Sequence, residues 1–143
     1  MKSLLSFFLM MSLGVTLGAQ DNEDLVAIEA AVANFAAFGD QQNVAGLEGL
    51  LHPQFRAVVN RLFGSEEVSL MDKTVYLELI KTGKIGGDQR TVHLLEVEVV
   101  ANNAHVKALF VGEKLRFTTF ISLVKNPAGE WQIISDFPHI EQV

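Results

Sequence analysis

Asp136 is a carboxylate in a stretch, "GEWQIISDFP" over residues 129–138, that otherwise has the composition of a buried strand. A carboxylate on an apolar wall has a raised pKa, so it can act as a general base or accept a hydrogen bond from a ligand. The strand register that the turns predict makes Thr119 its cross-strand neighbour. Asp136 is therefore the candidate base if the protein is an enzyme, and the polar anchor if it only binds. The alternative is a shifted register that leaves Asp136 at a solvated sheet edge.

Three further side chains could serve a ligand. Tyr76 is the single tyrosine, and its hydroxyl could donate to a ligand oxygen, although the apolar positions around its helix favour plain packing. His93 falls on the same predicted face as Asp136, as a proton shuttle or a histidine of the rim. His52 precedes Pro53 and would either cap a helix or line the pocket mouth. The predicted ligand-binding set is Asp136, Thr119, Tyr76, His93, Phe117 and His52.

The first half of the chain predicts three helices that would position these groups. Residues 21–39 have one apolar stripe, a cap at Asp21 or Asn22 and a stop at Gly39. Residues 43–52 form a short second helix that Pro53 ends, and residues 54–63 alternate as a strand. Residues 69–83 predict a third helix in which Asp72 is a plausible cap.

The last third predicts strands only, broken by "NN", "GEK" and "NPAG". Helices followed by an antiparallel meander indicate an α+β domain with the helices on one face of a curved sheet. A two-residue turn at residues 102–103 would place Glu98 opposite Lys107, an opposite-charge pair that favours this register.

Two turn lengths decide which side chains point inward. With a two-residue turn at residues 113–114 and a four-residue turn at residues 126–129, Phe117, Thr119 and Asp136 face the helices. The opposite face then carries an aromatic patch too large to leave in water, which predicts a homodimer interface. Its members are Trp131, Phe120, Ile133, Val124 and Phe137. One extra residue in either turn would reverse these faces.

Composition excludes several kinds of site. The chain has no cysteine, so it has no disulfide, no thiolate nucleophile and no cysteine-based zinc site. Its net charge is −6 without a cluster of Lys or Arg, which argues against a nucleic-acid partner. No pair of histidines has the spacing of metal ligands. We therefore predict no metal and no cofactor.

The first nineteen residues have the order of a secretion signal. Lys2 precedes an apolar run over residues 4–17, and the small residues Gly18 and Ala19 follow, with cleavage expected after either of them. The mature part, residues 20–143, would be a single exported domain, periplasmic or secreted, with no membrane contact after cleavage. The alternative is an uncleaved membrane anchor.

The order of elements and two segments carry a resemblance to a known superfamily. The stretches "FAAFGDQQNVAGLEGLLHPQF" and "FTTFISLVKNPAGEWQI" are similar to those of nuclear transport factor 2-like proteins, nearest the exported putative lumazine-binding and SnoaL-like families. The resemblance implies a cone of three helices over a strongly bent, mostly antiparallel sheet, with a pocket between them and dimers that pack through the sheet. The superfamily holds both enzymes and members without chemistry, so the fold alone does not settle function.

Three hypotheses follow. The first is an exported accessory protein that binds a small apolar or aromatic molecule in the cone. The second is an isomerase- or dehydratase-type enzyme that uses Asp136 as base, with Tyr76 or His93 as donor. The third is a non-catalytic dimer that acts through protein interactions.

Overall fold

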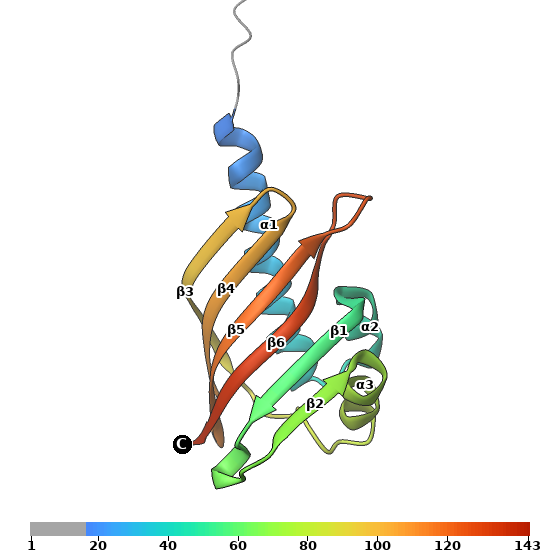
Figure 1. The fold of residues 1–143 in the computed structure, drawn as a ribbon, viewed down its shortest axis with the longest axis vertical. Coiled ribbons are helices and arrows are strands. Elements are labelled where there is room, and N and C mark those ends of the chain that lie inside the picture. The colour runs from blue at the N-terminus through green and yellow to red at the C-terminus, as the bar shows by residue number, and fades with distance from the viewer. Residues whose placement is uncertain (1–16) are drawn as a thin grey trace, which may run out of the picture.

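A long N-terminal helix lies along the inner face of the sheet in the computed structural model, which describes residues 17–143 (Figure 1). Helix α1 (Leu17–Asp40) buries its predicted stripe, with Ile28, Val32 and Phe35 almost fully covered. It starts before the predicted cap, and the predicted signal peptide lies largely outside the described residues. Over residues 17–143, no helix is both long enough and apolar enough to span a membrane.

The two shorter helices are each capped by a side chain. Asn43 Oδ1 accepts a hydrogen bond from Gly46 N at the start of α2 (Val44–Leu50). Asp72 Oδ1 accepts one from Val75 N at the start of α3 (Lys73–Lys81), so the predicted cap is confirmed. The third helix is shorter than predicted, because residues before Asp72 form a strand instead.

The sheet has six strands in the order β2-β1-β6-β5-β4-β3. Every neighbouring pair is antiparallel except β1 with β6, which are parallel. The sheet curves around α1 (Figure 1), and the predicted α+β class with a mostly antiparallel curved sheet is confirmed. The strands are β1 (Leu51–Asn60), β2 (Val68–Asp72), β3 (Thr91–Val100), β4 (Asn103–Val111), β5 (Leu115–Lys125) and β6 (Trp131–Gln142).

The β3–β4 hairpin has a different register from the predicted one. Its turn is at residues 101–102, where Ala101 adopts a φ of 53°, and Lys107 pairs with Glu96 rather than Glu98. An irregularity at Leu95 then reverses the alternation along β3. The prediction that His93 faces inward is therefore wrong, because His93 is exposed on the outer face.

The β5–β6 hairpin corrects the predicted interface. Lys125 pairs with Trp131, so this loop has five residues, 126–130, instead of four. Trp131 and Ile133 therefore point into the core, where they are 6% and 0% exposed, and their predicted placement on the outer face is wrong. The two-residue turn at residues 113–114 is confirmed, since Gly112 N donates to Leu115 O.

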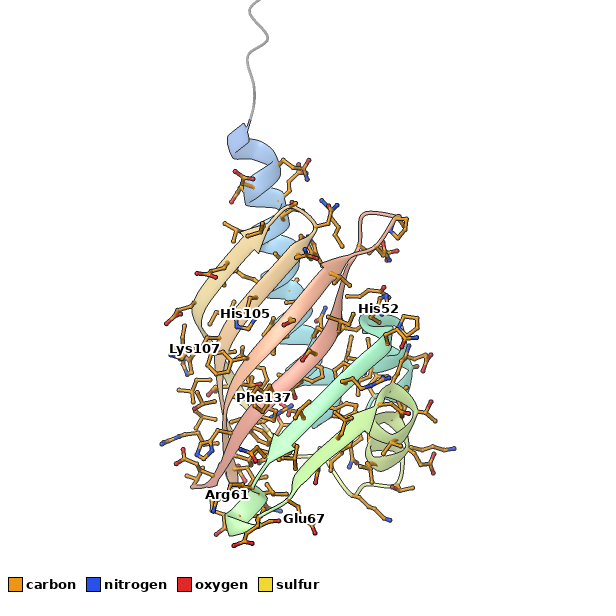
Figure 2. The ribbon with its side chains drawn as sticks, in the orientation of Figure 1. His52, Arg61, Glu67, His105, Lys107 and Phe137 are labelled. Carbon is orange, nitrogen blue, oxygen red and sulfur yellow. The ribbon has the colours of Figure 1, made fainter. Side chains whose placement is uncertain are left out.

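A β-bulge then restores the predicted direction of Asp136. Ile134 and Ser135 both lie between the inward-facing Ile133 and Asp136, where the register of β6 against β5 shifts. Phe137 points outward beside its partner Phe120, and His105 stacks on Phe120. Figure 2 shows His105, Lys107 and Phe137 on the face of the sheet turned away from α1.

Candidate functional site

A cavity of about 470 Å³ opens at the wide end of the cone, between α3, the inner face of the sheet and the loop before β3. Pockets for small molecules span roughly 300–1,000 Å³, so this cavity can hold one. Its walls are mostly apolar. The lining includes Phe35, Ala57, Val59, Met71, Tyr76, Leu79, Ile80, Phe110, Leu115, Phe117, Thr119, Asp136, Pro138 and Ile140.

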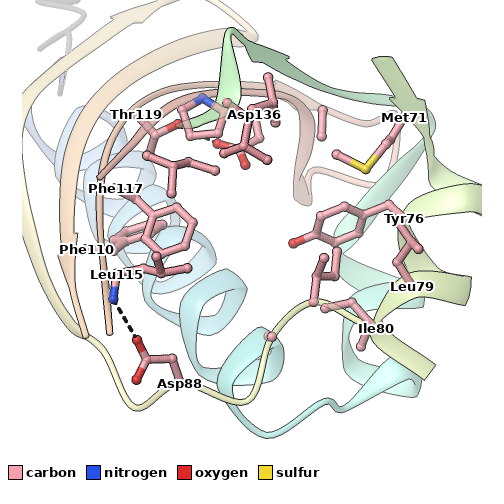
Figure 3. A pocket seen from close by; sticks show the side chains of 18 of the residues that line it. Met71, Tyr76, Leu79, Ile80, Asp88, Phe110, Leu115, Phe117, Thr119 and Asp136 are labelled. Carbon is pink, nitrogen blue, oxygen red and sulfur yellow. Dashed lines mark hydrogen bonds between the residues drawn. The ribbon is translucent and has the colours of Figure 1, made fainter. Parts of the chain in front are cut away.

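Asp136 is the carboxylate in the deep part of this cavity. Asp136 lies on β6, between its sheet partners Ala57 on β1 and Ile121 on β5, and only 8% of the residue is exposed. The Thr119 hydroxyl donates to Asp136 Oδ1 at 2.5 Å. Figure 3 shows the two side chains together on one wall. Within residues 17–143, no other hydrogen bond reaches this carboxylate, so Oδ2 is free to meet a ligand.

Burial sets the protonation behaviour of Asp136. The loss of water raises its pKa from 3.8 to about 6, although the Thr119 hydrogen bond and the charge of Arg90 oppose the shift. A carboxyl with such a pKa changes charge near neutral pH. At pH 7 the carboxylate can accept a proton or a hydrogen bond from a ligand. In mild acid it becomes protonated and no longer holds a ligand through its negative charge.

Tyr76 reaches the cavity from α3. Its ring stacks against Phe35 at 6.1 Å and meets the edge of Phe55 at 5.2 Å, which fixes its direction. Figure 3 shows its hydroxyl directed into the cavity, and this hydroxyl bonds to none of the described residues. Burial and the nearby Asp136 charge raise its pKa well above the ordinary value, so Tyr76 is a neutral donor.

Arg90, which sequence reasoning missed, forms part of the wall. Its guanidinium pairs with Asp40 and donates to Ala36 O at 3.0 Å, which ties the end of α1 to the start of β3. The same group lies 5.2 Å from the ring centre of Phe110 and 5.0 Å from that of Phe117. Its charge is thus matched by Asp40 and its faces are covered by aromatic rings.

The loop before β3 forms one side of the rim. Gly86 has a φ of +83°, and a Cβ there would meet Gly39 O at 2.5 Å, so only glycine fits. Asp88 accepts hydrogen bonds from the backbone of Glu113, Lys114 and Leu115. Burial raises the pKa of Asp88, but these backbone bonds outweigh burial and leave the pKa lowered. The paired glycines of "GGD" were the sequence signal for this close approach.

The turn between β1 and β2 forms the other side of the rim. Leu62 and Phe63 line the mouth, and Phe63 is 58% exposed. Arg61 and Phe63 have φ values of 53° and 49°, a left-handed conformation that costs a non-glycine residue about 1 kcal/mol or more. Strained backbone of this kind often accompanies ligand sites.

The cavity brings together four of the six predicted ligand-binding residues. Asp136, Thr119, Tyr76 and Phe117 line it, whereas His93 lies on the outer face and His52 lies outside the lining. His52 accepts a hydrogen bond from Gln54 N at the start of β1, so it neither caps α2 nor lines the mouth. Over residues 17–143, no group of three His, Cys, Asp or Glu side chains could hold a metal ion.

The family model described as "Putative lumazine-binding" matches residues 23–137. This chain belongs to that family. No curated protein matches the chain.

Solved structures of the same fold are remote in sequence. A nuclear transport factor 2-like protein of unknown function from Silicibacter pomeroyi is 16% identical, with a TM-score of 0.73 over 85% of this chain and 98% of that one. A ketosteroid isomerase-like protein from Erwinia carotovora atroseptica is also 16% identical, with a TM-score of 0.66 over the same shares. A protein of unknown function with a cystatin-like fold from Nostoc punctiforme is 11% identical, with a TM-score of 0.68 over 83% of this chain and 92% of that one. These likenesses show the fold alone, and members of one fold differ in function.

Proposed function

We propose that the protein binds a small, mostly apolar molecule in the cone cavity, with Asp136 as the polar anchor. The observation that carries this proposal is the free Oδ2 of a buried carboxylate on an otherwise apolar wall. Ligand pockets typically combine apolar walls with a few placed polar groups. The Tyr76 hydroxyl, which bonds to no residue in the described part of the chain, supplies a second polar group that can donate a hydrogen bond where Asp136 accepts one.

A screen of aromatic and polycyclic compounds by thermal shift and native mass spectrometry tests this proposal. Two substitutions on β2 give a matched pair, because Ser69 lines the cavity and its neighbour Leu70 does not. Ser69→Phe should fill part of the cavity and weaken every hit, whereas Leu70→Phe should leave the affinities unchanged. Equal affinities in the two variants would contradict binding in the cone.

A second candidate function is an isomerase- or dehydratase-type reaction with Asp136 as base. Two features favour it: the burial of Asp136, which raises its pKa to about 6, and the Tyr76 hydroxyl directed into the same cavity. Asp136 would remove a proton from the carbon next to a carbonyl group. The Tyr76 hydroxyl would donate a hydrogen bond to the carbonyl oxygen as that oxygen gains negative charge. His93 has no part in this scheme, since it lies on the outer face.

Hydrogen exchange separates catalysis from binding. Compounds that bind would be incubated with the protein in D₂O, and deuterium at their acidic carbon positions would be followed by NMR. Turnover should disappear in Asp136→Asn while binding persists. The absence of exchange with every bound carbonyl compound would leave the protein as a binder only.

We further propose a homodimer that packs through the outer face of the sheet. Phe120 and Phe137 face each other across β5 and β6 and are 42% and 47% exposed, and Val124 lies on the same face. An exposed apolar patch can pack against the same patch of a second copy around a two-fold axis, which supports this proposal. Export to the periplasm or the medium is proposed from the N-terminal sequence, and N-terminal sequencing of protein from those fractions tests it.

A further inference from the structure

The charges that face the cavity leave one carboxylate without a counter-ion. Arg90, from the loop before β3, is paired with Asp40 at the end of α1. Asp88 directs its oxygens to backbone amides of the β4–β5 turn. Lys84 lines the exposed rim, and Tyr76 on α3 stays neutral. Among the described residues Asp136 on β6 therefore has no ion-pair partner, and the charge of Arg90, which is already paired with Asp40, only partly offsets its burial.

Aromatic rings surround the space in front of this carboxylate. Tyr76 enters from α3, and Phe35 lies beside it on α1. Phe110 and Phe117 form the wall on β4 and β5 and already hold the Arg90 guanidinium against their faces. Phe63 lies at the mouth. Aromatic faces attract cations, and the attraction grows when water is excluded.

A bare carboxylate oxygen in an apolar cavity is costly unless a donor or a cation meets it. A neutral ligand donor would supply one hydrogen bond to Oδ2 and leave the charge uncompensated. A ligand carboxylate would add a second negative charge beside the first. A protonated amine supplies both a hydrogen bond and the missing charge, and its carbon skeleton suits the aromatic walls.

We infer that the cavity is selective for hydrophobic cations, meaning ring-bearing amines or protonated nitrogen heterocycles, whose nitrogen is held by Asp136 Oδ2. This inference rests on the proposed binding function and narrows its ligand class. A metal ion does not fit the same position, because among the described residues no group of three His, Cys, Asp or Glu side chains comes together there.

Three probes with one skeleton test the inference: naphthalen-2-ylmethylamine, naphthalen-2-ylmethanol and 2-naphthoate. Their affinities for the full mature protein would be measured by calorimetry at pH 7.5. The amine should bind at least tenfold more tightly than the alcohol, and the carboxylate should bind most weakly. Between pH 7.5 and pH 5 the affinity for the amine should fall at least threefold as Asp136 gains a proton, while that for the alcohol stays nearly constant.

Two asparagine variants locate the selectivity. Asp136→Asn keeps the size of the side chain and should remove the preference for the amine and its pH dependence, with less than threefold change for the alcohol. Asp88→Asn removes another charge that lines the cavity and should keep the preference. An equal loss of preference in both variants would assign it to the general negative field and overturn the inference.

The outcomes separate this inference from the proposed function. Equal affinities for the amine and the alcohol in the wild type would overturn the selectivity for cations and leave small-molecule binding intact. Tighter binding of 2-naphthoate would overturn it as well. If none of the three probes binds while the protein stays folded, both the inference and the proposed cavity function fail.

Discussion

The Thr119 hydroxyl donates to Asp136 Oδ1 although the two residues are not direct partners in the sheet. Thr119 lies opposite Pro138, and Asp136 lies opposite Ile121, so the hydrogen bond runs diagonally between β5 and β6. Both side chains point toward the cavity, where water is largely excluded. One neutral donor does not offset the burial of a charged carboxylate, which is why the pKa of Asp136 is raised rather than lowered.

This raised pKa predicts a pH-dependent loss of stability that Asp136→Asn should remove. The pKa of the folded state, about 6, exceeds the ordinary value of 3.8, so the folded protein holds the proton more tightly than the unfolded chain. The stabilisation is complete below pH 3.8 and is lost as the pH rises through 6. Two pKa units correspond to roughly 3 kcal/mol.

Urea denaturation at several pH values measures this effect. Asp136→Asn should unfold with a free energy close to that of the wild type at pH 4, and be more stable by up to roughly 3 kcal/mol at pH 7.5. Because other groups titrate equally in both proteins, the difference isolates Asp136. A difference that does not change with pH would show that Asp136 is solvated or paired in solution.

The direction of Asp136 was predicted correctly, but for an incomplete reason. The loop before β6 has five residues rather than four, which alone would have turned Asp136 outward. The bulge at Ile134 and Ser135 compensates for this extra residue, so Asp136 faces inward while Trp131 and Ile133 do as well. A bulge depends on how neighbouring strands twist and pack, and hydrophobic alternation within one strand does not reveal it.

Structural features that depend on nearby residues were predicted from the sequence, whereas those that depend on distant contacts were not. The apolar stripe of α1, the inward residues of β5 and the cap at Asp72 each depend on nearby residues, and each was predictable. Strand β2 was missed because its five residues directly precede a helical pattern. The Arg90–Asp40 pair joins residues fifty positions apart, and only the folded chain brings them together.

Asp24 should anchor the N-terminal half of α1 to the sheet. Its Oδ1 accepts from Lys125 Nζ at 2.8 Å and from Trp131 Nε1 at 3.0 Å. The hydrogen bond from Lys125, followed by that from Trp131, lowers the pKa of Asp24. A lowered pKa contributes stability above pH 3.8 that is lost as the pH falls through the folded-state value.

Asp24→Asn should therefore lower the Tm at pH 7, and the difference from the wild type should shrink below pH 4. Asp21→Asn is the matched control, since Asp21 lies one turn earlier on α1 and is exposed. Calorimetry of both variants at the two pH values checks the prediction. Equal Tm values for the two variants at pH 7 would mean that this contact contributes nothing measurable.

The proposed homodimer predicts that a charge on the outer face dissociates it. Phe120→Asp should yield monomers in sedimentation-velocity experiments, because the carboxylate would be buried against the partner. Val100→Asp is the control, since Val100 is 72% exposed at the β3–β4 turn, away from Phe120 and Phe137. Monomers in the wild type, or dimers in Phe120→Asp, would contradict an interface at this face.

The close packing at Gly86 predicts that any side chain at this position would disturb the shape of the rim and lower the stability of the fold. In Gly86→Ala the new methyl group would lie 2.5 Å from Gly39 O, at a φ of +83° that alanine rarely adopts. The substitution should cost about 2 kcal/mol or more in unfolding free energy. Because Ile85 and Lys84 line the cavity beside it, the affinity for a cavity ligand should fall as well.

Gly49→Ala is the matched control for this variant. Gly49 lies near the end of α2, and a Cβ there would meet no atom within 4 Å. Alanine is favoured over glycine in a helix, so this variant should be more stable than the wild type by up to about 1 kcal/mol, with unchanged ligand affinity. Urea denaturation and calorimetry of both variants give the comparison. If Gly86→Ala were as stable as the wild type, the contact between the loop before β3 and the end of α1 would have to open in solution, and the rim would not be the rigid boundary that this structure describes.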